Sequence, residues 1–146
     1  AEQLKKHSLK RIYKAVAIGN VKDDEGTIHA PIGRHHTDRK KMAVVSNGKD
    51  AITHYKVLER YPGYTFMQFQ LETGRTHQIR VHMASIGHPL LGDEIYGGKN
   101  TSFHTIGQTL HAETISFIHP VSNELIEINA PMPEYFVKIL NKLRNI

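Results

Sequence analysis

The stretch LETGRTHQIRVHMASIGHPLLGDEIYGG, residues 71–98, decides the local fold and holds most of the candidate chemistry. As a strand, residues 76–83 would alternate between a polar face and a mainly apolar face. As a helix, the same segment has Thr76 as its N-cap and Gly87 as a left-handed residue after its last turn. The apolar stripe of this helix would consist of Ile79, Met83 and Ile86. Because both end signals fit, we predict a helix.

Strands and hairpins are expected on either side of this helix. Residues 11–19 alternate with both faces partly apolar, which is typical of a strand that is covered on each side. Further expected elements are strands at 26–30 and 42–45, and hairpins over 51–72 and 108–131. Helices are expected at residues 1–9 and after Pro133, where the apolar stripe consists of Phe136, Ile139, Leu140 and Leu143.

Length and composition restrict the class of protein. The 146 residues form one domain by size. The absence of cysteine excludes disulfides, thiolate metal sites and cysteine nucleophiles, and it suits a reducing, cytoplasmic setting. No apolar run approaches the ~18 residues of a membrane span. The chain begins without methionine in what reads as mid-helix, so we expect a piece of a longer protein.

The charge of the chain favours an anionic partner. Its formal net charge is +5 and its sequence pI is about 9.5, which is a common feature of nucleic-acid-binding domains. Basic residues cluster at 4–11, 33–41 and 138–144. Within the second cluster, the candidate RNA-binding residues are Arg34, Arg39, Lys40 and Lys41.

Two chemistries that the histidines suggest have weak support. Helical zinc ligands usually lie four residues apart, but His77 and His82 are five apart and no cysteine assists them. We therefore expect no metal. The sequence contains no Gly-x-Ser-x-Gly turn, which a serine hydrolase would need. The segment at 98–100 lacks the full spacing of a phosphate-binding loop.

Tyr13 and Arg80 remain as candidates. Tyr13 lies on a strand of small and apolar residues, where its ring could stack on a planar ligand or serve as a core tyrosine with a bonded hydroxyl. Arg80 has apolar neighbours, so a partly buried guanidinium is expected, and this needs an anionic partner. A structural ion pair with Glu72 or Glu113 is the alternative to a functional role.

The same residues resemble those of a known family. ETGRTHQIRVHMASIGHPLLGDEIYGG closely resembles the signature of the RluA family of RNA pseudouridine synthases. RIYKAVAIG resembles the family's tyrosine-bearing strand, and the segments at 26–60 and 108–136 resemble the family's next segment and its ending. The resemblance covers nearly the whole chain. It implies an α+β fold, with a bent, mainly antiparallel sheet flanked by helices, and a cofactor-free isomerisation of uridine in ribosomal or transfer RNA.

The resemblance also implies roles for individual residues. Tyr13 matches the tyrosine that stacks on the target uracil, and Arg80 matches the arginine that pairs with an aspartate nucleophile. The residues expected at the pocket entrance are Arg75, Thr76, His77 and Gln78. Asp93 and Tyr96 match a Gly-Asp…Tyr-Gly turn that we interpret as structural.

The family's nucleophile lies in a His-Arg-Leu-Asp motif, which does not occur in this sequence. We expect it upstream of Ala1, so the chain would be the C-terminal part of a catalytic domain and inactive alone. An S4-like domain could precede it, and the sequence leaves the oligomeric state open. A buried Arg80 without that aspartate should take another acceptor or a bound anion. The rival interpretations are a non-catalytic RNA-binding module and, with weaker support, a metal-dependent hydrolase.

Overall fold

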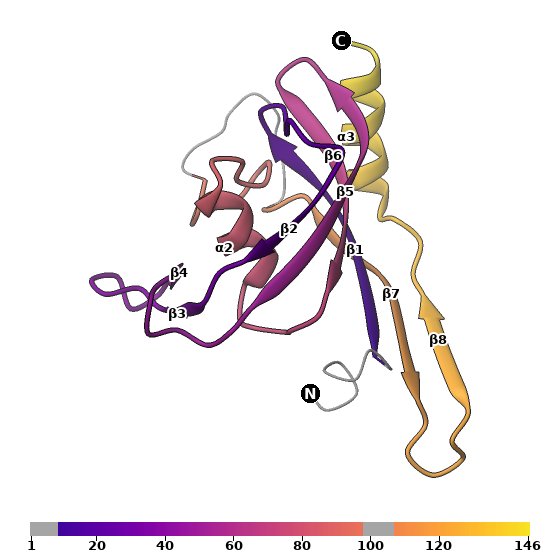
Figure 1. Cartoon of the computed structure of the whole chain (residues 1–146). Coiled ribbons are helices and arrows are strands. Elements are labelled where there is room, and N and C mark those ends of the chain that lie inside the picture. The colour runs from indigo at the N-terminus through magenta and orange to yellow at the C-terminus, as the bar shows by residue number, and fades with distance from the viewer. Residues whose placement is uncertain (1–8, 98–106) are drawn as a thin grey trace.

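The computed structural model describes residues 9–97 and 107–146, and its main feature is a six-stranded sheet in the order β2-β5-β6-β1-β7-β8 (Figure 1). Its strands are β1 (Lys10–Ile18), β2 (Glu25–His29), β5 (Ile52–Tyr61), β6 (Tyr64–Leu71), β7 (Leu110–Ile118) and β8 (Leu125–Asn129). Each neighbouring pair is antiparallel. A smaller sheet pairs β3 (Ile32–Arg34) with β4 (Met42–Val44), and the helices of the described part are α2 (Gln78–Ser85) and α3 (Glu134–Arg144). The expected α+β fold is confirmed.

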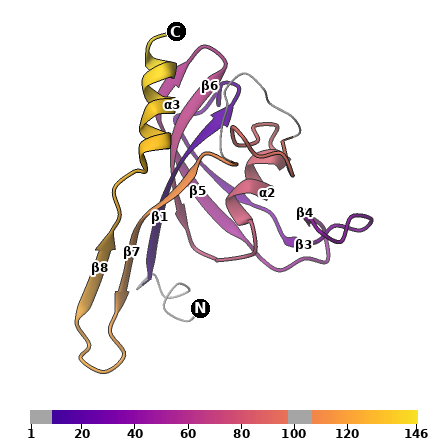
Figure 2. The ribbon, with the colours of Figure 1, turned by 180° about the vertical axis from the view of Figure 1, so that it is seen from behind.

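Both predicted hairpins form. The β5–β6 hairpin turns at Pro62 and Gly63, and Gly63 has a φ of 80°, a left-handed conformation that glycine adopts at no steric cost. The β7–β8 hairpin turns at residues 119–124 and projects away from the body of the molecule (Figure 2). The three-residue strand β3 was not predicted, and the expected helix at 1–9 falls almost wholly outside the described residues.

The two helices cover opposite faces of the sheet. Successive side chains of a strand point to opposite faces of the sheet, so β1 presents alternate residues to each helix. On one face, Ile79 and Met83 of α2 pack in a cluster with Met67 and Phe69. On the other, the predicted stripe of α3 is fully buried, and its Phe136 packs on the Phe66 ring with centroids 6.0 Å apart. The centre of β1 is therefore buried from both sides, as predicted.

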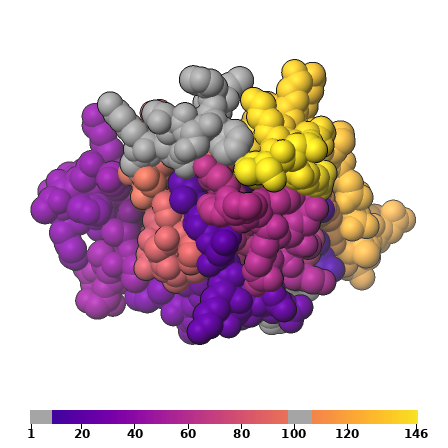
Figure 3. Space-filling model, turned by 90° about the horizontal axis from the view of Figure 1, so that it is seen from above, coloured from indigo at the N-terminus to yellow at the C-terminus, as the bar shows by residue number. Residues whose placement is uncertain are grey.

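The ends of the molecule are formed by different segments. In the space-filling view, the segment that bears β3 and β4 lies at one end and the β7–β8 hairpin at the other, with α3 seated over the β5–β6 hairpin (Figure 3). The face of the sheet under α2 lies between these ends. A β-bulge interrupts the pairing of β1 with β7 between Ile12 and Tyr13, on this part of the sheet.

Candidate active site

A cavity of about 240 Å³ lies between β1 and the segment that leads into α2. Its wall contains Tyr13 and Arg80, the two residues that the sequence singles out. Three of the four residues expected at the pocket entrance also line it, namely Arg75, His77 and Gln78. The remaining wall residues are Arg11, Leu71, Gly74, Ile79, Gln108 and Leu110. The fold thus brings residues 67 positions apart in sequence to one cavity, since Tyr13 and Arg80 both line it.

The Tyr13 side chain faces this cavity from β1. Its ring is half-buried and packs on the core cluster under α2. Its hydroxyl makes no hydrogen bond with any described residue, which differs from the alternative of a core tyrosine with a bonded hydroxyl. The neighbouring β-bulge is a device that re-aims side chains and is common beside active sites. The ring and its hydroxyl are therefore both available to a ligand.

The Arg80 guanidinium is buried and paired. Its Nε donates to Oδ2 of Asp93 at 2.9 Å, and its Nη2 donates to Oδ1 at 3.0 Å. The exposed fractions of the two side chains are 9% and 0%. This bidentate hydrogen bonding raises the pKa of Arg80 above its ordinary value, more than burial lowers it. The expectation that a buried Arg80 takes another acceptor is confirmed, with Asp93 as that acceptor.

The partners suggested for Arg80 are wrong. Glu72 bonds the His54 ring at 2.6 Å, and Glu113 pairs with a lysine of β1 at 2.9 Å. Asp93 reaches Arg80 because the segment after α2 folds back along β1, where two backbone hydrogen bonds and a bridge at Leu90 hold it. This return of the chain is a tertiary feature that spacing alone does not reveal.

Asp93 and Tyr96 contact the cavity residues Arg80 and His77. Oδ1 of Asp93 also accepts hydrogen bonds from the backbone N–H groups of Ile95 and Tyr96, both at 3.2 Å, and so closes the turn. The Arg80 guanidinium lies over the Tyr96 ring, 5.0 Å from its centroid. The Tyr96 hydroxyl bonds Nδ1 of His77 at 2.7 Å. Burial, and next the Arg80 charge, lower the pKa of His77, so the neutral ring is favoured there.

The start of α2 differs from the prediction. Thr76 is exposed, and the N-cap position belongs to His77, whose φ is 55° and whose side chain makes no capping hydrogen bond. Gln78 organises this segment instead. Its Oε1 accepts from the backbone N–H of Arg75 at 3.0 Å and from the Thr73 hydroxyl at 2.7 Å. The end of the predicted stripe is also wrong, because Ile86 is 40% exposed.

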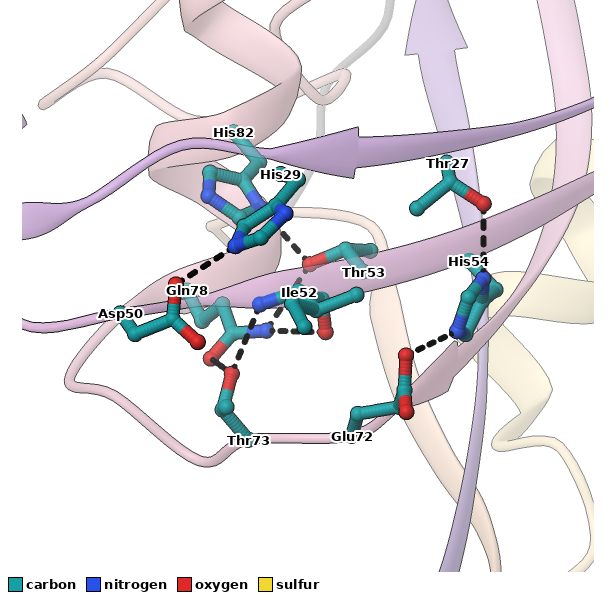
Figure 4. Close-up of polar contacts among 10 residues, drawn as sticks. All are labelled: Thr27, His29, Asp50, Ile52, Thr53, His54, Glu72, Thr73, Gln78 and His82. Carbon is teal, nitrogen blue, oxygen red and sulfur yellow. Dashed lines mark hydrogen bonds and ion pairs between the residues drawn. The ribbon is translucent and has the colours of Figure 1, made fainter. Parts of the chain in front are cut away.

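Gln78 begins a polar network that runs under the cavity wall (Figure 4). Its Nε2 donates to the Ile52 carbonyl at 3.0 Å and to the Thr53 hydroxyl at 2.9 Å. The Thr53 hydroxyl bonds Nδ1 of His82 at 2.7 Å, and Nε2 of His82 bonds the Ala30 carbonyl at 2.9 Å. Burial lowers the pKa of His82, which is fully inaccessible. The neutral ring therefore donates to Ala30 and accepts from Thr53.

The basic loop, which consists of residues 33–41, lies outside the cavity, and two neighbouring hollows connect it with the cavity wall. Arg75 and Thr76 line a second hollow together with Arg34. Arg34 lines a third hollow with Arg39, whose carbonyl accepts a hydrogen bond from Arg34 Nη1 at 3.0 Å. The other two predicted basic residues, which line neither of these hollows, are Lys40 and Lys41.

Three further findings concern metal binding, membrane crossing and one missed cavity residue. Among residues 9–97 and 107–146, no three histidine or carboxylate side chains are placed to hold a metal ion. In the same ranges, no helix combines the length and apolar character that crossing a bilayer requires. Arg11 was missed as a cavity residue. Its position two residues before Tyr13 on one strand places both on the same face and could have revealed it.

Comparisons with known proteins agree with this arrangement. Residues 1–85 match a family described as RNA pseudouridylate synthase. An uncharacterized RNA pseudouridine synthase of Synechocystis is 47% identical over 146 residues, which are 97% of this chain and 45% of the relative. Ribosomal large subunit pseudouridine synthase D of Pseudomonas aeruginosa is 46% identical over 154 residues, covering 97% of this chain and 48% of the relative. The chain thus spans about half the length of these relatives.

A solved structure gives the same fold. Human RNA Pseudouridylate Synthase Domain Containing 1 matches with a TM-score of 0.75 and 24% identity, over 99% of this chain and 69% of that one. The family match covers more than half of the chain, and the sequence signature lies in the loop and helix that form the cavity wall. The chain therefore belongs to the RluA family of RNA pseudouridine synthases.

Proposed function

We propose that this chain supplies the base-binding and orienting groups for isomerisation of uridine to pseudouridine in RNA. The aspartate nucleophile would come from a part of the polypeptide that this chain does not include, because the sequence has no His-Arg-Leu-Asp motif. The observation that carries the proposal is that Tyr13 and Arg80 line one cavity, to whose wall residues 9–97 and 107–146 contribute no carboxylate. A base and an incoming carboxylate would therefore meet no negative charge from the described wall residues.

Tyr13 has the geometry of a stacking platform. The target uridine must leave its stack in the RNA, at a cost of a few kcal/mol. Stacking on an aromatic ring returns ~1–3 kcal/mol per base. The half-buried ring is fixed by the core beneath it, so little side-chain entropy is lost when a base binds.

Arg80 has unused hydrogen-bonding capacity on one edge. Asp93 accepts from its Nε and Nη2, whereas Nη1 makes no hydrogen bond with the described residues. A carboxylate that met this edge would be held in one orientation and kept ionised, since an opposite charge at such range lowers a carboxylate pKa by ~1–3 units. In the reaction, this aspartate would attack the nucleotide and the N-glycosidic bond would break. The uracil would rotate and rejoin the ribose through carbon 5, the aspartate would be released, carbon 5 would lose its proton and N1 would gain one.

Structured RNA is the proposed partner, and ribosomal RNA is the favoured class. Several relatives are named ribosomal large subunit pseudouridine synthase D. The hollows that lead from the cavity towards the basic loop provide positive charge along the approach, at Arg34, Arg39 and Arg75. Phosphate contacts of this kind position a nucleic acid without reading its sequence.

Tritium release from RNA labelled at carbon 5 of uridine tests the proposal, using this chain beside a polypeptide extended upstream. Release only by the longer polypeptide is expected. Release by the chain alone would identify one of its own carboxylates as the nucleophile and overturn the assignment. In the longer polypeptide, Tyr13→Ala should reduce turnover more than RNA affinity, whereas equal losses would argue against stacking.

The second candidate function is a non-catalytic RNA-binding module, which the exposed basic loop favours. A longer polypeptide that binds RNA and releases no tritium, and that has no His-Arg-Leu-Asp segment upstream, would support this alternative.

A further inference from the structure

The candidate cavity has an unbalanced positive charge. Among the described residues, three guanidinium groups line it, those of Arg11, Arg75 and Arg80, and no carboxylate does. Glu113 lines an adjoining hollow and pairs with Lys14 at 2.9 Å. The charge of Arg80 is matched by Asp93 behind the wall. Arg11 forms no hydrogen bond or ion pair with any described residue. Within the part of the chain that the structure describes, the Arg75 side chain bonds only the carbonyl oxygen of Asp50, through Nε at 2.7 Å. Two of the cavity's cations, Arg11 and Arg75, therefore have no acidic partner among the described residues.

The fold places Arg11 and Arg75 on the wall of one cavity. Arg11 lies two residues before Tyr13 on β1, and both side chains line the cavity. Its guanidinium lies against the loop at Gly74, where an added Cβ would come within 2.6 Å of Nη1. Because Gly74 has no side chain, the Arg11 guanidinium has room next to it, one residue before Arg75. Arg11 is half-buried, so part of its hydration is already lost.

Partly desolvated guanidinium groups without an acidic protein partner favour an anionic ligand. Arginine matches phosphate oxygens with two parallel hydrogen bonds, and such charge-assisted bonds are the stronger kind. An aromatic ring that lies beside them suits a base on the same strand. A phosphate joined to a stacked nucleotide is the ligand that meets both features.

We propose that Arg11 and Arg75 form a phosphate subsite that holds the RNA strand next to the base stacked on Tyr13. The inference rests on the proposed base-binding role of Tyr13 and adds to it a contact that distinguishes a nucleotide from a nucleoside. The subsite fixes the position of the strand at the cavity and carries no sequence preference. Its contribution falls as salt concentration rises, because phosphate binding releases counterions.

The test compares binding of uridine 5′-monophosphate and of uridine to this chain by NMR titration at low salt. Arg11→Gln should weaken nucleotide binding by about tenfold, the factor expected when one charge-assisted contact is lost. It should leave uridine binding unchanged. Arg11→Lys should retain part of the affinity. Lys10→Gln is the matched control, since it removes the same charge from an exposed neighbour on β1 that does not line the cavity, and it should keep the affinity.

The outcomes separate this inference from the proposed function. Equal nucleotide affinity of the unsubstituted chain and Arg11→Gln, with weaker binding by Tyr13→Ala, would overturn the subsite and leave the base site standing. Unchanged uridine binding by Tyr13→Ala would instead argue against the base site. Absence of any nucleotide-induced shift at the cavity residues would overturn the subsite. Circular dichroism spectra that match for all variants establish that folding is not the cause.

Discussion

Replacing Asp93 with Asn should destabilise the chain strongly, because it leaves the buried Arg80 cation without a counter-charge. The substitution preserves the side-chain shape and one carbonyl oxygen, so the turn hydrogen bonds to the backbone N–H groups of residues 95 and 96 can persist. It removes the negative charge and one of two acceptors that Arg80 uses at 2.9 and 3.0 Å. Removing one partner of such a buried pair costs about 3–5 kcal/mol.

The loss is large relative to the total stability of a domain, which is about 5–15 kcal/mol. Urea denaturation of this chain, followed by circular dichroism, measures it as a shift in midpoint at constant slope. The surface pair of Asp24 and Arg60 provides the control, since its side chains are 83% and 40% exposed. Asp24→Asn should cost less than about 1 kcal/mol, because solvent screens such pairs.

A double-mutant cycle isolates the pair itself. Arg80→Met removes the cation and keeps much of the apolar stem, so Asp93→Asn should cost less in that background by about 2–3 kcal/mol. Additive losses would refute the coupling between these two side chains. A cost of Asp93→Asn as small as that of the surface control would refute the idea that Asp93 compensates the buried charge.

Three further predictions concern other parts of the chain. The folded-state pKa of His82 lies below the ordinary value of 6.5, so the unfolded chain binds more protons and the free energy of unfolding should fall as pH drops through 6.5. The free energy of unfolding should change by at most about 1.36 kcal/mol per pH unit from this group. Urea denaturation at several pH values should show a weaker pH dependence of that free energy in His82→Gln. An unchanged pH dependence would exclude this histidine as its source. Gly48→Ala should lower stability by about 1–3 kcal/mol, because the new Cβ would lie 2.5 Å from the carbonyl carbon of Ile32, and a thermal melt equal to that of the unsubstituted chain would contradict this. Burial and a hydrogen bond to Glu59 raise the pKa of Tyr61 to about 12, so Glu59→Gln should lower it while leaving it above 10, as phenolate absorbance would report.

Local patterns in the sequence were enough to predict the hairpins and the last helix. The β5–β6 hairpin has alternating apolar residues on both sides of Pro62–Gly63, and these are short-range signals. The stripe of α3 is read at helical spacing and is buried because the helix packs on one face of the sheet. By contrast, β3 consists of Ile32, Gly33 and Arg34, and its single apolar side chain gives no alternation from which a strand could be recognised.

Contacts between distant segments account for what the sequence missed. His82 is fully buried because Thr53 and the Ala30 carbonyl satisfy both ring nitrogens, and neither lies near it in sequence. The N-cap at Thr76 failed because the side chain of Gln78 holds the incoming loop in another conformation, with His77 left-handed. Side-chain hydrogen bonds of this kind depend on the assembled fold, so residue spacing does not predict them.

The pairing of Arg80 with Asp93 joins the structural and the functional interpretations of this arginine. A guanidinium has five N–H donors, and the bidentate pair uses two of them, on Nε and Nη2. The pair compensates the buried charge, so the chain does not need the catalytic aspartate for Arg80 to be accommodated in the fold. Because Asp93 is fixed by its own turn, it also fixes the orientation of the Arg80 guanidinium at the cavity wall. In the proposed function, this structural ion pair would hold Arg80 in place for the nucleophile, so the structural and the proposed catalytic interpretation are compatible.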